Sequence, residues 1–206
     1  MNRSIFHFAF LLIFFTLTGC ALSPDRIELG YTAQQGVNRI PGANNVSVNV
    51  QVIDQRQDKT KVSSKKNGYG MEMAAITAAE DVAITVRRAI EQELQLRGFQ
   101  VGSDTALIQI ASDVTRFYND HKTGFFAGDA VADLNMSIAV KSKNGNLLYS
   151  RQVNAQGVEA NIQLMSGENA KIALNRALEN GMKTLFEDKA FLAALVNSSS
   201  QKLGSK

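Results

Sequence analysis

The chain has 206 residues, of which 22 are Lys or Arg and 19 are Asp or Glu, so its formal net charge is only +3. This near balance argues against nucleic acid as a partner, because nucleic-acid binding requires a markedly basic surface. One cysteine and two histidines leave few of the groups that metal sites and nucleophilic catalysis commonly use, and they permit no disulfide within the chain.

The first twenty residues have the layout of a bacterial lipoprotein signal. Arg3 supplies a positive charge, and an apolar run extends from Ile5 to Leu17. A helix of that length spans about 20 Å, which is too short for the roughly 30 Å hydrocarbon core of a bilayer but typical of a cleavable signal. The run ends in Leu17-Thr18-Gly19-Cys20, which resembles the lipobox that directs diacylglyceryl transfer to a cysteine. We therefore predict a signal peptide over residues 1–19 and lipid attachment, including palmitate, at Cys20.

The predicted anchor also predicts a location. One acyl chain gives marginal membrane binding and two or more give stable anchoring, so a fully acylated Cys20 would hold the protein on a membrane. Ala21 follows Cys20, whereas Asp at that position is typical of retention at the inner membrane in the sorting pattern that this signal resembles. We expect a Gram-negative protein that is lipid-anchored at the outer membrane and faces the periplasm.

The rest of the chain divides into three predicted parts. Residues 20–45 contain both prolines and no sustained periodicity, so we predict a lipidated N-terminus and flexible tether, in which Ile27-Glu28-Leu29 could pack as an edge strand. Residues 46–197 have the length and patterning of a single periplasmic domain. The small polar residues 198–206 predict a disordered tail.

The first half of the domain predicts two strands and a helix. Valines alternate with polar residues over 46–52, which indicates a half-buried strand, and a shorter strand is expected over 71–77. Asp81 is a suitable N-cap for a helix that continues to Arg97, because apolar residues recur there every four positions. Gly98 gives the expected C-terminal stop.

The second half repeats these signals in another order. The predicted strands cover 108–114, 134–140 and 147–158, and the predicted helices cover 166–188 and 191–196. Asn144-Gly145 between the last two strands is a strong hairpin signal, because both residues tolerate positive φ. One apolar face per element predicts an α+β fold: a two-layer sandwich in which two long helices cover one face of a mostly antiparallel sheet of about four to five strands.

The chain has few of the side chains that commonly form catalytic or metal-binding sites. His7 belongs to the signal, and we expect His121 to lie in an exposed polar loop, Asp120-His121-Lys122. No nucleophile elbow, phosphate-binding loop or dinucleotide fingerprint is present. We predict a protein that is not an enzyme and that has no catalytic residues, cofactor or metal.

Asp54 and Asp58 are the carboxylates that come nearest to an active-site pair. Glycoside hydrolysis needs two carboxyl groups roughly 5–9 Å apart, one of them with a raised pKa. Arg56 lies between them in the sequence and would lower both pKa values. We therefore favour an ion-paired turn and keep a glycan hydrolase as an alternative.

Two further groups have a structural and a functional interpretation. Lys59, Lys61, Lys65 and Lys66 form a basic stretch that is more often a solvated loop than an anion site. Two aromatic residues, Phe125 and Phe126, follow Phe117 in the sequence and either tuck under the sheet or mark an exposed surface. If all three surround a pocket between sheet and helices, the protein would be a carrier of a hydrophobic ligand.

The order of several short motifs is similar to that of the YajG family of outer-membrane lipoproteins. The motifs are Gly19-Cys20, Asp54-Gln55-Arg56 with Asp58, Arg97-Gly98-Phe99-Gln100-Val101-Gly102, the Asn144-Gly145 hairpin, and Val158-Glu159 before the last long helix. The resemblance covers nearly all of the mature chain. It implies lipid attachment and a place in the cell envelope, and it brings no catalytic residues.

These observations predict a lipid-anchored envelope protein that acts as a non-enzymatic binding or structural module at the outer membrane. Its partners would be the membrane, through the anchor at Cys20, and an envelope protein, glycan or lipid whose identity the sequence does not give.

Overall fold

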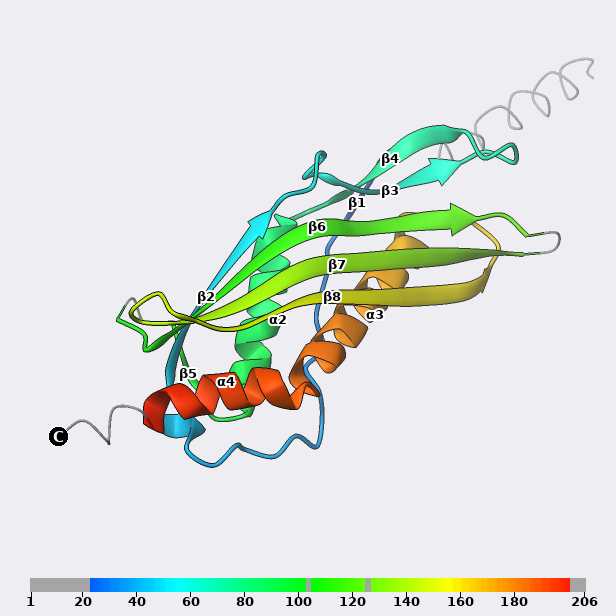
Figure 1. The fold of residues 1–206 in the computed structure, drawn as a ribbon. Helices are drawn as coiled ribbons and strands as arrows, with labels where there is room; N and C mark the ends of the chain where they lie inside the picture. The colour runs from blue at the N-terminus through cyan, green and yellow to red at the C-terminus, as the bar shows by residue number, and fades with distance from the viewer. Residues whose placement is uncertain (1–22, 103–104, 125–126, 201–206) are drawn as a thin grey trace, which may run out of the picture.

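A computed structural model describes residues 23–102, 105–124 and 127–200, with side chains as far as Asn197. Two sheets and three α-helices make up the described chain (Figure 1). The smaller sheet has the order β1 (Asp25–Ile27), β4 (Glu72–Ala78), β3 (Lys61–Lys66). The larger has the order β5 (Gln100–Val101), β2 (Ser47–Asp54), β6 (Ile108–Lys122), β7 (Gly128–Ser142), β8 (Leu147–Ile162). The helices are α2 (Val82–Leu96), α3 (Gly167–Phe186) and α4 (Lys189–Ser200), and a 3-10 turn, η1, covers Ala43–Asn45.

The α+β class is confirmed, but the larger sheet is mixed rather than mostly antiparallel. β2 pairs in parallel with both β5 and β6, whereas β6, β7 and β8 pair antiparallel. The parallel pairs arise because α2 carries the chain from one end of the sheet back to the other, so the next strands run in the same direction as β2. The smaller sheet was not predicted as a separate sheet.

The core lies between one face of the larger sheet and the helices. Alternate residues of β2, β6 and β7 turn to this face and are buried, among them Val48, Ile110, Leu134, Met136 and Ile138. The long helices α2 and α3 cover the same face, as the sequence predicted (Figure 1). The opposite face of β6, β7 and β8 has no helix on it.

Gly157 lets β8 approach α3 closely. A Cβ at this position would lie 2.1 Å from the carbonyl oxygen of Ala173 and 2.3 Å from the backbone nitrogen of Ala177. Real Cβ atoms do not come so near, so any other residue would push the strand from the helix. This contact fixes the C-terminal half of β8 against the middle of α3.

The helix ends agree with the local sequence signals. The Asp81 side chain accepts a hydrogen bond from the Ala83 backbone N–H at 2.8 Å, and the Ser166 side chain accepts one from Asn169 at 3.3 Å. Gly98, directly after the C-cap of α2, has φ +94°. These caps satisfy N–H groups that have no partner within the helix.

The predicted flexible tether is wrong for the part of it that is described. From Asp25 onward the segment forms β1 at the edge of the smaller sheet, and Leu29 and Tyr31 pack against the core. Ala43 is fully buried in η1. The predicted tail is also wrong for 198–200, which continue α4. The N-terminal segment is held because it covers apolar surface that would otherwise face water.

Candidate functional site

Arg56 lies where the two sheets meet, and its guanidinium is fully used by the fold. Nε and Nη2 donate to the Asp54 carboxylate at 2.9 and 2.7 Å, and both residues are buried. Nη1 donates to the carbonyls of Phe117 (3.1 Å) and Lys61 (3.2 Å), and Nη2 also donates to that of Lys59 (2.6 Å). Because all three nitrogens are engaged, Arg56 joins strands and has no donor left for a ligand.

Asp58 faces away from that ion pair. Its Oδ1 accepts from the backbone N–H groups of Lys61 and Thr60 and from the Thr60 hydroxyl, each at 3.0 Å. These hydrogen bonds hold the pKa of the Asp58 carboxyl below its ordinary value. The predicted ion-paired turn is therefore confirmed for Asp54 and Arg56, and Asp58 instead caps the next turn. A general acid needs a raised pKa, whereas that of Asp58 is lowered, and the Asp54 carboxylate is bound by Arg56.

Side-chain hydrogen bonds join β3 to the part of β6 that extends beyond its pairing with β2. Ser63 donates to the carbonyl of Asn119 at 2.9 Å and accepts from the Asn119 side chain at 2.9 Å. Nδ1 of His121 donates to the carbonyl of Ser64 at 2.9 Å. We call Asp54, Arg56, Ser63, Asn119 and His121 the seam, because these side chains close the gap between the two sheets.

The prediction that His121 lies in an exposed loop is wrong. β6 continues to Lys122, so His121 is a strand residue, and only 3 % of its surface is exposed. Burial lowers the pKa of His121. The sequence did not show this, because the long hairpin of β6 and β7 includes polar residues at its end.

The predicted basic loop is largely a strand, and three of its four lysines form ion pairs. Lys61 binds Glu72 at 2.5 Å, Lys65 binds Asp25 at 2.8 Å, and Lys66 binds Asp120. Exposed ion pairs of this kind stabilise weakly, but they leave little unbalanced positive charge. The solvated interpretation agrees with the structure better than an anion site.

The predicted aromatic group is only partly described. Phe117 is fully buried in the core. Phe125 and Phe126 lie outside the described residues. Cys20 also lies outside them.

A buried cluster on α2 holds the N-terminal segment, and the sequence analysis missed it. Glu93 is fully buried and pairs with Arg97, one helical turn later. Oε1 of Glu93 accepts from the Tyr31 hydroxyl at 2.6 Å and from the backbone N–H of Gln34 at 2.8 Å. We call Tyr31, Gln34, Glu93 and Arg97 the clasp. The sequence could have indicated this cluster, because Glu93 lies three residues after Ile90 and therefore on the buried side of the predicted helix.

Asp25 attaches the same segment at the other end of the domain. Its carboxylate accepts from the backbone N–H of Gly167, the first residue of α3, at 2.8 Å, and binds Lys65. Burial by itself raises the pKa of Asp25, but Lys65 and the Gly167 N–H outweigh it and hold the pKa below its ordinary value. A Cβ on Gly167 would lie 2.8 Å from the Asp25 carboxylate, so the glycine permits this contact.

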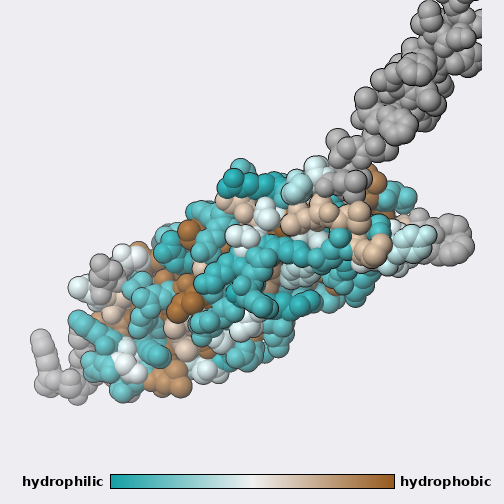
Figure 2. Space-filling model, turned by 90° about the horizontal axis from the view of Figure 1, so that it is seen from above, coloured by the Kyte–Doolittle hydropathy of each residue, from teal (hydrophilic) through white to brown (hydrophobic). Residues whose placement is uncertain are grey.

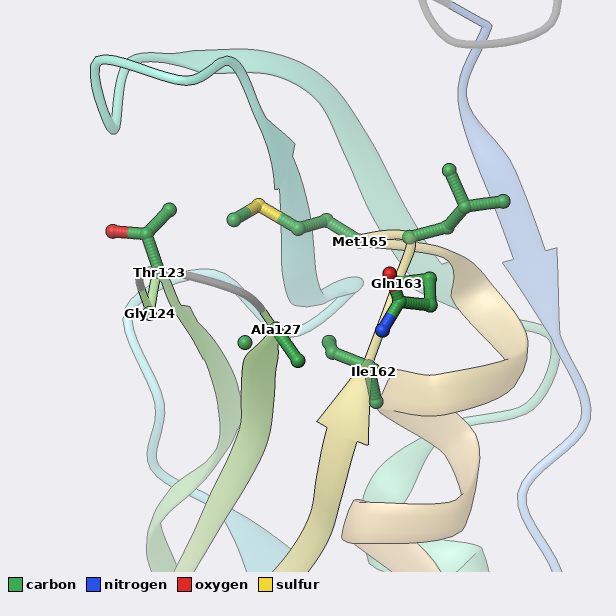
Figure 3. Close-up of a pocket in the computed structure, with 8 residues that line it drawn as sticks. Thr123, Gly124, Ala127, Ile162, Gln163 and Met165 are labelled. Carbon is green, nitrogen blue, oxygen red and sulfur yellow. The ribbon is translucent and has the colours of Figure 1, made fainter.

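A small hollow opens at this end, between the β6–β7 hairpin and the β8–α3 loop (Figure 3). It measures about 180 Å³, and its described lining includes Thr123, Ala127, Ile162 and Met165 but no charged residue. Ligand pockets commonly measure roughly 300–1,000 Å³. The hollow is therefore small for a ligand site, and its polar lining side chains are those of Thr123 and Gln163.

The uncovered face of β6, β7 and β8 carries uncharged polar side chains. Asn135 lies opposite Asn154, and Ser137 lies opposite Gln152, on neighbouring strands. Gln152 and Asn154 are exposed and Asn135 is half-buried. Within the described part of the chain, no hydrogen bond involves the side-chain amides of Asn135, Gln152 or Asn154. These amides are free to bind a partner, and we call them with Ser137 the amide face.

Two of the charged groups next to the amide face form an ion pair. Arg116 binds Asp133 at 3.0 Å, and Asp133 also accepts from the Gln156 amide at 3.1 Å. The surface is polar, and it also includes the carboxylate of Asp113, which lies opposite Ser137 and accepts a hydrogen bond from its hydroxyl. In the sequence, every second residue of one part of β8 carries a side-chain amide, and this pattern could have predicted the polar surface.

Two further observations concern only residues 23–102, 105–124 and 127–200. No helix there is long and apolar enough to cross a membrane. No group of three or more His, Cys, Asp or Glu side chains in the same residues is placed to hold a metal ion.

Comparison with known proteins supplies the family. Residues 33–196 match the model of a family described as uncharacterized lipoprotein. The chain belongs to this family. The match covers most of the chain and confirms the resemblance to YajG-type lipoproteins, so a membrane-anchored envelope protein is the expected kind of molecule. No curated protein matches the chain.

Solved structures are similar to the chain to different degrees. A Xanthomonas campestris protein is 13 % identical with a TM-score of 0.60, and the match covers 85 % of this chain and 99 % of that one. A minor lipoprotein from Acinetobacter baumannii is 7 % identical with a TM-score of 0.41 over 75 % of this chain and 94 % of that one. The first similarity supports the fold alone.

Proposed function

We propose that this family member is lipidated at Cys20, is held at the outer membrane facing the periplasm, and binds an envelope partner without catalysing a reaction. Membership of a lipoprotein family and the Leu17-Thr18-Gly19-Cys20 sequence support the anchor. Acyl chains on the cysteine sulfur and on the new amino group together give the stable attachment that one chain does not.

The absence of an assembled active site in the described residues supports a binding role. Asp54, Arg56 and His121 are all hydrogen-bonded within the seam, where they join strands. Glu93 and Arg97 are used in the same way by the clasp. The polar groups that might have carried chemistry therefore stabilise the fold.

The amide face is the observation that carries the binding role. These amides have no partner within the described residues, and amides supply both donors and acceptors to a partner. Because the side-chain amides are themselves uncharged, we expect a partner that offers uncharged hydrogen-bonding groups to them. Such contacts would depend little on ionic strength.

Metabolic labelling tests the anchor. Labelled palmitate should enter the full-length protein and not the Cys20→Ser variant, and only the former should fractionate with the outer membrane. A wild-type protein that stays unlabelled and appears in the soluble fraction with residues 1–19 attached would contradict the anchor.

Crosslinking in intact cells tests the amide face. We expect wild-type protein to give a specific crosslinked product that Asn154→Arg reduces at least tenfold, because the longer charged side chain cannot fit against an uncharged partner. The matched control is Gln95→Arg, which changes an exposed amide on α2, on the other side of the molecule. Equal loss with both variants, or none with either, would contradict binding through this face.

A further inference from the structure

We propose that the end of the domain at which β1 begins rests on the lipid bilayer, with the exposed apolar side chains of the β3–β4 hairpin and the β8–α3 loop in contact with lipid. The proposal rests on the proposed lipidation of Cys20. It adds an orientation: this domain does not hang freely from its anchor.

The path of the chain brings the anchor to this end. β1 runs parallel to β4 with Asp25 opposite Ile76, so the chain before Asp25 enters from the side on which β4 begins. Five residues separate Cys20 from Asp25 and span at most about 18 Å. Along β4, the four residues from Ile76 back to Glu72 cover roughly 13 Å. A lipid on Cys20 therefore keeps the start of β4 near the headgroups.

The attachment at Asp25 makes this geometry firm. Asp25 is bound to the first N–H of α3 and to Lys65 of β3, so the point at which the chain enters is fixed to two other elements. The clasp holds the same segment again at Tyr31. A domain tied at both positions cannot turn away from its anchor as one on a flexible tether could.

Large apolar side chains are exposed at this end. Tyr69 is 92 % exposed, Met71 59 % and Met73 44 %, all on or next to the β3–β4 hairpin, and Leu164 in the β8–α3 loop is 73 % exposed. Figure 2 views the side of the molecule that carries β3 and β4, where apolar side chains are scattered among hydrophilic ones, at this end and elsewhere. Exposed apolar groups that come from separate segments indicate an interaction surface.

Ion pairs and hydrogen bonds show that these segments share one end. Lys66 at the end of β3 binds Asp120 near the end of β6. Asp129 at the start of β7 accepts from the backbone of Asn161 near the end of β8. In Figure 1 the β3–β4 hairpin and the end of β8 accordingly lie at the same end of the molecule.

The hairpin tip is suited to an apolar environment. The Asn67 side chain accepts from the backbone N–H groups of Tyr69 and Met71, each at 3.0 Å, and Gly70 donates to the Asn67 carbonyl at 2.9 Å. Backbone groups without partners are costly in lipid, and these already have them. Tyrosine is enriched at membrane interfaces because its ring is apolar and its hydroxyl is polar.

Charge plays a small part in this contact. Lys61, Lys65 and Lys66 are the lysines of the hairpin, and each is paired with an acidic residue. The contact should therefore be apolar and should depend little on the fraction of anionic lipid, unlike that of a polybasic surface.

A single tryptophan can test the contact, because the chain contains none. Mature lipidated protein carrying Tyr69→Trp would be reconstituted into phosphatidylethanolamine–phosphatidylglycerol vesicles with and without brominated phospholipid. The matched control is Leu147→Trp, at a residue 60 % exposed where β8 begins, at the opposite end of the sheet. Flotation of the vesicles shows first that the protein is anchored.

We expect bromine to quench the tryptophan at position 69 at least twofold and to leave the one at position 147 unchanged, at every content of phosphatidylglycerol. Protein that floats with the vesicles but shows no quenching at position 69 would overturn the docking while leaving the anchor intact. A blue-shifted emission at position 69 without quenching would indicate a protein contact, from a second copy or another partner, and would also overturn it. Failure to float would contradict the anchor itself.

Discussion

The seam and the clasp are both built on a buried ion pair between residues close in sequence, yet they hold very different parts of the molecule. Arg56 binds Asp54 two residues away and then reaches carbonyls of β6 and of the chain that leads into β3. Glu93 binds Arg97 four residues away and then accepts from the N-terminal segment. The seam therefore joins two sheets, and the clasp fastens a segment that lies on the outside of a helix.

The comparison shows that a short-range ion pair gains its importance from the distant groups it also binds. Removing one partner of a buried pair leaves the other charge without compensation. In the seam, the other groups bound by the ion pair belong to the sheets, so removing one partner should destabilise the whole domain. In the clasp, they belong to a surface segment, so much of the lost stability should be local to that segment.

Arg56→Ala should give the largest effect. It leaves Asp54 buried without a cation and leaves strand carbonyls without donors, so the free energy of unfolding should fall by about 3–5 kcal/mol. Urea unfolding measures this fall. The control is Arg88→Ala, which removes the exposed pair with Glu80 and should cost about 0–1 kcal/mol. Equal effects of the two variants would mean that the seam does not join the sheets.

Glu93→Gln should come second. Arg97 would lose its counter-ion, and Tyr31 and Gln34 would donate to a neutral amide instead of a carboxylate, so we expect a loss of about 2 kcal/mol. Hydrogen exchange of residues 29–37 should accelerate more than that of β6 and β7. Uniform acceleration over all strands would show that the clasp supports the fold in the same way as the seam.

Tyr31→Phe should have a smaller and more local effect. It removes the hydroxyl that donates to Glu93 but keeps the ring against the core, so the cost should be about 1 kcal/mol. Limited proteolysis should cut the N-terminal segment faster while the urea midpoint shifts little. Tyr69→Phe is the matched control, because Tyr69 is exposed and should not change either measurement in solution.

Acid should weaken the second attachment of the same segment, at Asp25. The folded-state pKa of Asp25 lies below its ordinary value of 3.8, so this group stabilises the fold above that pH and the contribution is lost as the pH falls through the folded-state pKa. Because Asp25 is partly exposed, we expect only a few tenths of a kcal/mol. Proteolysis of the N-terminal segment by an acid-active protease should rise below about pH 4 in wild type. Asp25→Asn should show the raised rate at both pH 5 and pH 3, and an unchanged rate in the variant would contradict the role of Asp25.

Local signals in the sequence were sufficient for most elements. The helices near 81–97 and 166–188 were predicted because caps and a four-residue apolar repeat act within a few turns. The Asn144-Gly145 hairpin was predicted because positive φ at Gly145 is a property of the residue itself. The strand at 46–52 was predicted from its alternating valines.

Local sequence patterns could not predict which residues pair when they lie far apart in the chain. Val48 lies beside Ile108 in a parallel pair, and nothing local to either strand fixes the direction of its neighbour. His121 is buried because β3 packs over the end of β6, and Arg56 reaches Phe117 across 61 positions. The amide face also depends on register, since Asn135 and Asn154 lie opposite each other only in this pairing of β7 with β8.

The sequence by itself predicts a lipoprotein signal, and it determined the likeness to an envelope family and the kinds of secondary structure, since each depends on residues within short windows. Tertiary structure decided which polar groups are used up in the seam and the clasp, which amides stay free, and which apolar side chains gather where the chain enters the domain. These outcomes depend on contacts between residues dozens of positions apart, and such contacts form only when the sheets and helices pack together.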